Sequence, residues 1–225
     1  MTFQRLRSIT GVVAALGVVL MALMVFVWSP LESSMGLVQK IMYIHVPSAW
    51  VCYLAITVAF VFSIAYLWKR QEIFDVIALS TVEIGVLFCG LALLTGSIWA
   101  KPTWNTFWIW DARLTTTLIL FLIFSGYLLL RRFTDYGEQQ ARLSAVVAII
   151  GTLDIPLIHL SVVWWRSIHQ PSTVFSPKPG VIDERILVTL LFSVTIFSVI
   201  YLYLLVTRVE YEQKKRIYLK EVSNL

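Results

Sequence analysis

Charged side chains are scarce in this 225-residue sequence: only 14% of its residues are Asp, Glu, Lys or Arg, whereas 59% are apolar. A soluble domain carries roughly a quarter charged residues, and it could not cover so much apolar surface with polar groups. The composition therefore excludes an ordinary soluble enzyme or binding domain. It indicates a protein whose natural solvent is the lipid bilayer.

Cysteine, repeats and nucleotide-binding loops are also rare or absent. Cys52 and Cys89 stand in apolar segments without a Cys-x-x-Cys pair, which predicts small core residues rather than thiol or zinc chemistry. The sequence has no internal repeat, no Gly/Ser linker and no Gly-rich phosphate-binding loop, so we expect a single domain, 1–225, that does not itself hydrolyse ATP. The net charge of +5 does not indicate nucleic acid, because membrane topology and anionic lipid explain the basic clusters.

Six apolar runs are each long enough to cross the roughly 30 Å hydrocarbon core of a bilayer. The first lacks a clear signal-peptide cleavage site, so we expect it to be retained as a span. We therefore predict an all-α bundle of six transmembrane helices with a tryptophan-rich outer interfacial segment. The expected spans are Ile9–Trp28, Ile44–Trp68, Val76–Trp99, Leu114–Leu130, Leu143–Trp164 and Ile186–Thr207.

Lysine and arginine are unevenly distributed among the connections between these spans. If the amino terminus is cytoplasmic, the inner segments carry roughly twice as many basic residues as the outer ones, as the positive-inside rule requires. This bias predicts that both termini lie in the cytoplasm. The longer connections, which hold most of the chemically interesting side chains, then lie on the outer side of the membrane.

Two histidines are expected on the outer side of the membrane. His45 precedes Pro47, which is tolerated in the first turn of a helix, so His45 should lie at the membrane surface. His169 follows the fifth span and faces the same compartment. Each histidine alone is more often a surface residue bonded to backbone or lipid, and zinc is disfavoured because no third and fourth ligand are apparent.

The densest aromatic stretch, Lys101–Leu114, lies between these histidines in the sequence. Trp104, Phe107, Trp108 and Asp111 stand at i, i+3, i+4 and i+7, so a short interfacial helix would present three rings and one carboxylate on one face. Tryptophan belts are ordinary membrane anchors, and a purely structural subunit stays an open alternative.

The combination of histidines, aromatic rings and cations in one compartment favours heme. Imidazole is an axial ligand of heme iron, large flat rings pack on the macrocycle, and cations suit the propionates.

Three ionisable residues inside the predicted spans, Glu83, Asp154 and His159, are functional candidates of another kind. They would line the path of a small-molecule or ion transporter, although no inverted repeat supports that reading.

Four segments, in the same order along the chain, resemble the CcmC family of heme-handling proteins of cytochrome c maturation. They are Tyr43–Ala49, Thr95–Pro102, Trp104–Leu114 and Ile155–Pro171. Two departures are visible, because Asn105 stands where the family usually has glycine and Phe107 where it usually has tryptophan.

The resemblance implies that His45 and His169 are the two axial ligands of heme b. It assigns the surrounding contact platform to Trp104, Phe107, Trp108, Trp110 and Asp111. It also implies display of heme at the periplasmic face of the bacterial inner membrane and loading onto the heme chaperone CcmE, in a complex with CcmD and with the ABC transporter subunits CcmA and CcmB. Whether heme attachment to CcmE is catalysed is left open. The related synthases CcmF and CcsA are longer chains with a further pair of membrane histidines, which this sequence lacks.

Overall fold

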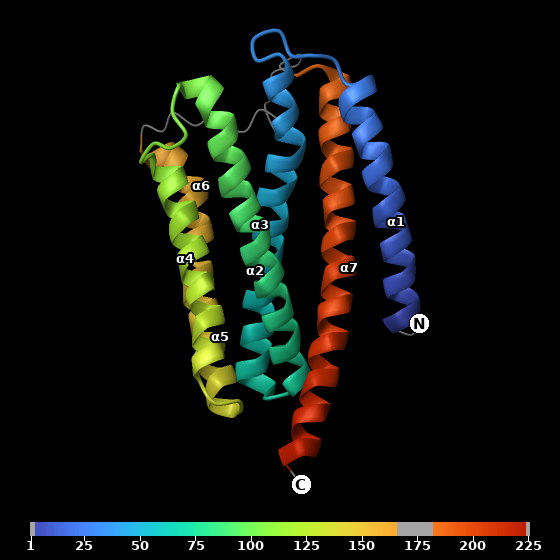
Figure 1. Cartoon of the computed structure of the whole chain (residues 1–225). Coiled ribbons are helices and arrows are strands. Elements are labelled where there is room, and N and C mark those ends of the chain that lie inside the picture. Colours follow the sequence, from blue (N-terminus) through green and yellow to red (C-terminus); the bar gives the residue numbers. More distant parts are fainter. Residues whose placement is uncertain (1–2, 166–181, 224–225) are drawn as a thin grey trace.

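The computed structural model describes residues 3–165 and 182–223 as a bundle of long helices (Figure 1). A π-helical turn, Met24–Trp28, continues the first helix, and a 3-10 turn, Leu37–Ile41, precedes the second. The described part has no β-strand, and six of its helical segments are long and apolar enough to cross a membrane. The prediction of an all-α bundle with six transmembrane helices is therefore confirmed. The α-helices are α1 (Phe3–Leu23), α2 (Met42–Lys69), α3 (Glu72–Trp104), α4 (Ala112–Phe133), α5 (Glu138–Thr152), α6 (Asp154–Trp164) and α7 (Glu184–Ser223).

Successive spans run in opposite directions, so the connections alternate between two ends of the bundle (Figure 1). One end carries the segments 29–36 and 105–111, the end of α6 and the start of α7. We call it the tryptophan end, because it holds Trp28, Trp104, Trp108, Trp110 and Trp164. The other end, here called the charged end, carries the short connections 70–71 and 134–137, and α7 extends beyond its neighbours there.

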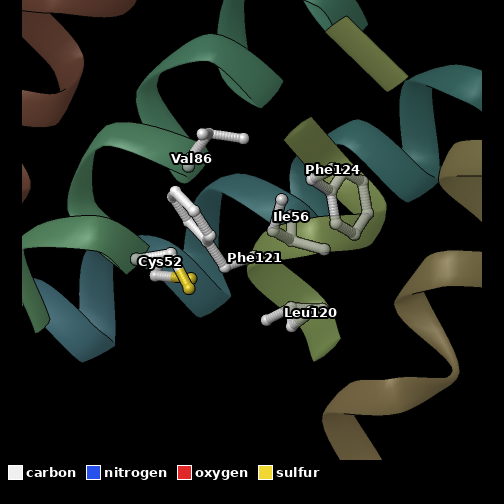
Figure 2. A pocket seen from close by; sticks show the side chains of 8 residues that line it. Cys52, Ile56, Val86, Leu120, Phe121 and Phe124 are labelled. Carbon is white, nitrogen blue, oxygen red and sulfur yellow. The ribbon is translucent and has the colours of Figure 1, made fainter. Parts of the chain in front are cut away.

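The centre of the bundle is a dry apolar core between α2, α3 and α4. Figure 2 shows the side chains that meet there, and the space between them is too small for a water molecule. Both cysteines belong to this core as free thiols, and each is only 2% exposed. The prediction that they are small core residues is therefore confirmed. The labelled side chains are Cys52, Ile56, Val86, Leu120, Phe121 and Phe124.

The fifth span is broken into two helices, which the sequence prediction had treated as one continuous run. α5 ends at Thr152 and α6 begins at Asp154, with a turn at Leu153 between them. The cause is Pro156, whose ring nitrogen has no hydrogen to donate to the carbonyl four residues earlier, that of Thr152, and whose ring crowds that carbonyl. The chain nevertheless continues to the tryptophan end as a single span.

A cluster of buried ion pairs joins α3, α4 and α7 at the charged end. The Asp75 carboxylate accepts two hydrogen bonds from the Arg131 guanidinium, at 2.6 and 2.8 Å, and a third from Arg216 at 2.7 Å. Nearer the centre of the bundle, Arg208 of α7 donates to both carboxylate oxygens of Glu83 on α3. These contacts fix the long α7 helix against the core, because each buried charge is matched by a partner.

Candidate functional site

The first turn of α2 is tied to the end of the first span, and this tie places His45 at the tryptophan end. The Lys40 ammonium donates to the carbonyl oxygens of Val25 and Ser29, at 2.6 and 2.7 Å. The hydroxyls of Ser29 and Tyr43 lie 2.5 Å apart, and Tyr43 is fully buried. His45 follows Tyr43 by two residues, so these bonds determine where its side chain leaves the helix.

The His45 imidazole reaches across to α3. Its Nδ1 atom lies 3.0 Å from the Ala92 carbonyl oxygen and 3.2 Å from the Thr95 hydroxyl oxygen. A carbonyl oxygen can only accept a hydrogen bond, so the proton of the neutral ring is on Nδ1. The Thr95 hydroxyl donates its own proton to the Leu91 carbonyl at 2.7 Å and serves as a second acceptor for Nδ1. No residue in the described ranges hydrogen-bonds to Nε2, whose lone pair is available to a metal.

Two further residues of α3 contact the same imidazole. A Cβ atom added at Gly96 would lie 2.9 Å from Cε1 of His45, so the ring packs directly on the glycine. The Trp99 ring meets the imidazole edge-on, with centroids 5.7 Å apart and planes at 75°. Sequence reasoning did not assign roles to Thr95, Gly96 or Trp99. Their spacing on one helix, at i, i+1 and i+4, was the available signal.

The segment after Trp104 is not the interfacial helix that its spacing predicted. α3 continues to Trp104 and ends there, and 105–111 has no helical hydrogen-bonding pattern. The termination occurs at Asn105, which adopts a left-handed conformation with φ of 58°. Asparagine and glycine tolerate this conformation better than other residues, so asparagine is well suited to end the helix here. Trp104, Phe107, Trp108 and Asp111 therefore do not share one helical face.

The aromatic side chains of 105–111 nevertheless gather at the tryptophan end. Trp108 and Trp110 meet edge-on, with ring centroids 5.7 Å apart. Phe107 is 58% exposed and lies under the Lys101 ammonium, and Trp110 is 74% exposed. The buried indole N–H groups of Trp99 and Trp108 have no hydrogen-bond partner within the described part of the chain. The segment thus offers flat apolar surface at Phe107 and Trp110, whereas the indole N–H groups of Trp108 and of Trp99, which belongs to α3, are enclosed.

Asp111 has a structural role that the sequence prediction did not include. It is the N-cap of α4, and its carboxylate accepts a hydrogen bond from the Arg113 backbone N–H at 2.9 Å. Its side chain is only 8% exposed, so it is not an open polar edge of an aromatic surface.

We expect Asp111→Ala to lower the free energy of unfolding by about 1 kcal/mol, because the first turn of α4 loses its cap. Asp111→Asn should stay close to wild type, since the asparagine oxygen can accept the same bond. Thermal unfolding of the purified protein in detergent measures both changes. Equal losses in the two variants would show that the charge of Asp111, and not its capping bond, stabilises the protein.

The remaining candidate residues are separated in the structure. His169 lies outside the described residues. Glu83 is paired with Arg208, whereas Asp154 is buried at the start of α6, and no contact in the described ranges joins it to Glu83. His159 bonds to the Ile155 carbonyl of its own helix at 3.1 Å. Among the described residues, no group of three His, Cys, Asp or Glu side chains is arranged to hold a metal ion.

Fold and site together define a polytopic α-helical membrane protein in which a histidine held by a neighbouring helix lies at the same end as an exposed aromatic segment. The sequence profile of one family, described as CcmC, heme exporter protein C, matches residues 1–223. The chain belongs to this family.

Individual relatives agree with this family membership. Heme exporter protein C of Bradyrhizobium diazoefficiens is 38% identical over 196 residues, which are 87% of this chain and 73% of that protein. A ccmC-like mitochondrial protein of cytochrome c biosynthesis from Marchantia polymorpha is 38% identical over 155 residues, 68% of this chain and 65% of that protein. Heme exporter protein C of Escherichia coli is 35% identical over 149 residues, 66% of this chain and 60% of that protein.

Proposed function

We propose that this chain binds heme b and displays it at the periplasmic face of the bacterial inner membrane, for loading onto the heme chaperone CcmE in c-type cytochrome biogenesis. The observation that carries the proposal is the His45 imidazole, whose Nδ1–H is held by α3 while Nε2 has no partner in the described ranges. A neutral imidazole with one free nitrogen is the form that ligates heme iron. The names of the relatives, which specify heme export and cytochrome c biosynthesis, support the same cargo.

The tryptophan end, at which His45 lies, suits a large, flat, dianionic cargo. The exposed rings of Phe107 and Trp110 offer apolar surface for the macrocycle. The cations of Lys101 and Arg113, at the same end of the bundle, favour the propionates. In this proposal His169 supplies the second axial imidazole. The resulting role is one of binding and orienting the heme, without a catalytic triad.

The charge distribution supports an orientation in which the tryptophan end is periplasmic. The charged end carries both termini and most of the Lys and Arg residues, and basic connections remain on the cytoplasmic side of the inner membrane. The tryptophans then lie at the outer interface, where aromatic rings are favoured.

We further propose that the chain works in a complex with CcmD and with the ABC transporter subunits CcmA and CcmB. The sequence has no phosphate-binding loop of its own, so ATP hydrolysis in such a complex belongs to a partner. The transporter alternative has less support, because the Glu83 carboxylate is paired with Arg208. In the described structure Glu83 also makes no contact with Asp154 or His159.

The test is purification of the chain in mild detergent from cells that also express tagged CcmE. We expect a low-spin heme absorption spectrum, heme b by pyridine hemochromogen assay, and recovery of the chain with the tagged chaperone. A colourless protein from heme-replete cells would contradict heme display. A heme-loaded protein that never co-purifies with CcmE would contradict the proposed loading of CcmE but not the proposed display of heme.

A further inference from the structure

We infer that α3 forms a positioning seat for His45, made of Ala92, Thr95, Gly96 and Trp99, which fixes the imidazole proton on Nδ1 and leaves Nε2 as the nitrogen offered to iron. The inference rests on the proposed function, because it concerns the histidine that binds the cargo. It assigns a role to residues on a different helix from His45. The two that bond to Nδ1, Ala92 and Thr95, lie 47 and 50 residues after His45 in the sequence.

Hydrogen bonding supplies the first argument. Both acceptors of Nδ1 are themselves fixed by α3, since Ala92 contributes a backbone carbonyl and the Thr95 hydroxyl is held by the Leu91 carbonyl at 2.7 Å. A tautomer with the proton on Nε2 would place the Nδ1 lone pair against the Ala92 carbonyl oxygen at 3.0 Å, which is repulsive. The neutral ring is therefore held in a single tautomer.

Packing supplies the second, independent argument. The imidazole lies so close to Gly96 that any side chain there would overlap it, because an added Cβ would be 2.9 Å from Cε1 and 3.3 Å from Nδ1. On the same helix, the Trp99 ring contacts the imidazole edge-on. Glycine at 96 thus leaves room for the imidazole against α3, and the two contacts restrict the ring plane.

The expected consequence follows from the behaviour of outer-shell partners in metal sites. A hydrogen bond from the second ring nitrogen to a carbonyl orients a histidine ligand and raises its basicity, and loss of such a partner weakens metal binding about 10- to 100-fold. The seat should therefore set both the affinity and the ligand geometry of His45. Thr95, Gly96 and Trp99 are positioning residues, because they act through His45.

The first test uses heme-free protein labelled with 15N-histidine. The sequence has three histidines, so the resonances of His45 are identified by their loss in His45→Ala. We expect wild-type His45 to show one protonated nitrogen, Nδ1, and one unprotonated nitrogen, Nε2. Gly96→Ala pushes the ring off its acceptors and should give a mixture of tautomers. Wild-type signals in Gly96→Ala, or an Nε2–H tautomer in wild type, would overturn the inference.

The second test measures heme retention and the visible spectrum in matched variants. Gly96→Ala should retain heme about 10- to 100-fold less well and convert low-spin heme partly to high-spin. Thr95→Val should show a smaller change in the same direction, and Thr95→Ser should restore the wild-type spectrum. The control is Gly126→Ala on α4, where an added Cβ meets no atom within 4 Å. Unchanged heme in Gly96→Ala, beside loss in His45→Ala, would overturn the seat while leaving the proposed function intact.

Discussion

Replacing His45 with alanine is expected to abolish the low-spin heme spectrum of the purified protein and to reduce heme retention roughly tenfold or more. In the proposed function His45 would hold the heme iron, and α3 fixes the orientation of its imidazole, so no other side chain could take its place without a rearrangement. The measurement is the absorption spectrum and heme content per protein, compared with wild type prepared in parallel. Added imidazole should partly restore the low-spin spectrum of His45→Ala, because the free base can fill the vacated ligand position.

Two further variants make this prediction specific. His159→Ala is the matched control, since His159 bonds to its own helix through Nδ1 and lies on α6, and it should keep the wild-type spectrum. The double variant of His45 and His169 should be colourless while still inserting into the membrane. If the double variant retained heme like wild type, the axial-ligand assignment would be wrong, and a structural role for the aromatic belt would be favoured.

Replacing Asp75 with alanine is expected to cause the largest loss of stability, about 3–5 kcal/mol, because it leaves two buried cations without their shared partner. The side chains of Asp75, Arg131 and Arg216 are only 5%, 7% and 6% exposed. Among the described residues, Arg131 would keep only the Tyr127 hydroxyl as a partner, at 3.2 Å, whereas Arg216 would keep the carboxylate of Glu212 at 3.1 Å. Burial of the Arg131 guanidinium without a carboxylate is costly, because the interior replaces little of its hydration. Chemical or thermal unfolding in detergent, followed by intrinsic fluorescence, measures the change.

An exposed ion pair at the same end provides the control for this prediction. Arg70 and Glu138 lie 3.3 Å apart, with side chains 42% and 69% exposed. Glu138→Ala removes a carboxylate of the same charge, yet its effect should not exceed about 1 kcal/mol, because solvent screens the pair. Similar losses in Asp75→Ala and Glu138→Ala would show that burial does not determine the strength of these contacts.

The separation of the two ends of the bundle has a consequence for interpreting such variants. Asp75 belongs to the charged end and His45 to the tryptophan end, so a folded Asp75 variant should keep the heme spectrum of wild type at low temperature. The two predictions therefore test different properties of one molecule, its stability and its cargo site.

Several features of the fold were predictable from the sequence because they depend on local physics. Each bilayer crossing needs about 20 consecutive apolar residues, so the number of spans follows from hydropathy alone. The break before Pro156 follows from the missing N–H of proline, although the sequence prediction did not apply that rule. The pattern around Trp104 was misleading, because spacing of i, i+3, i+4 and i+7 does not reveal that a left-handed residue, Asn105, ends the helix.

The sequence by itself thus determined the membrane class, the number of spans and the resemblance on which the candidate residues depend, because each depends on composition or on residues close together in the sequence. Only the tertiary structure decided that His45 takes its hydrogen-bond acceptors from α3, and that Asp75 is shared by arginines 56 and 141 residues away. Hydropathy places helices in the bilayer but does not fix their rotation or their neighbours. Those are set by packing and by the hydrogen bonds and ion pairs of buried polar groups, most of which form only in the folded bundle.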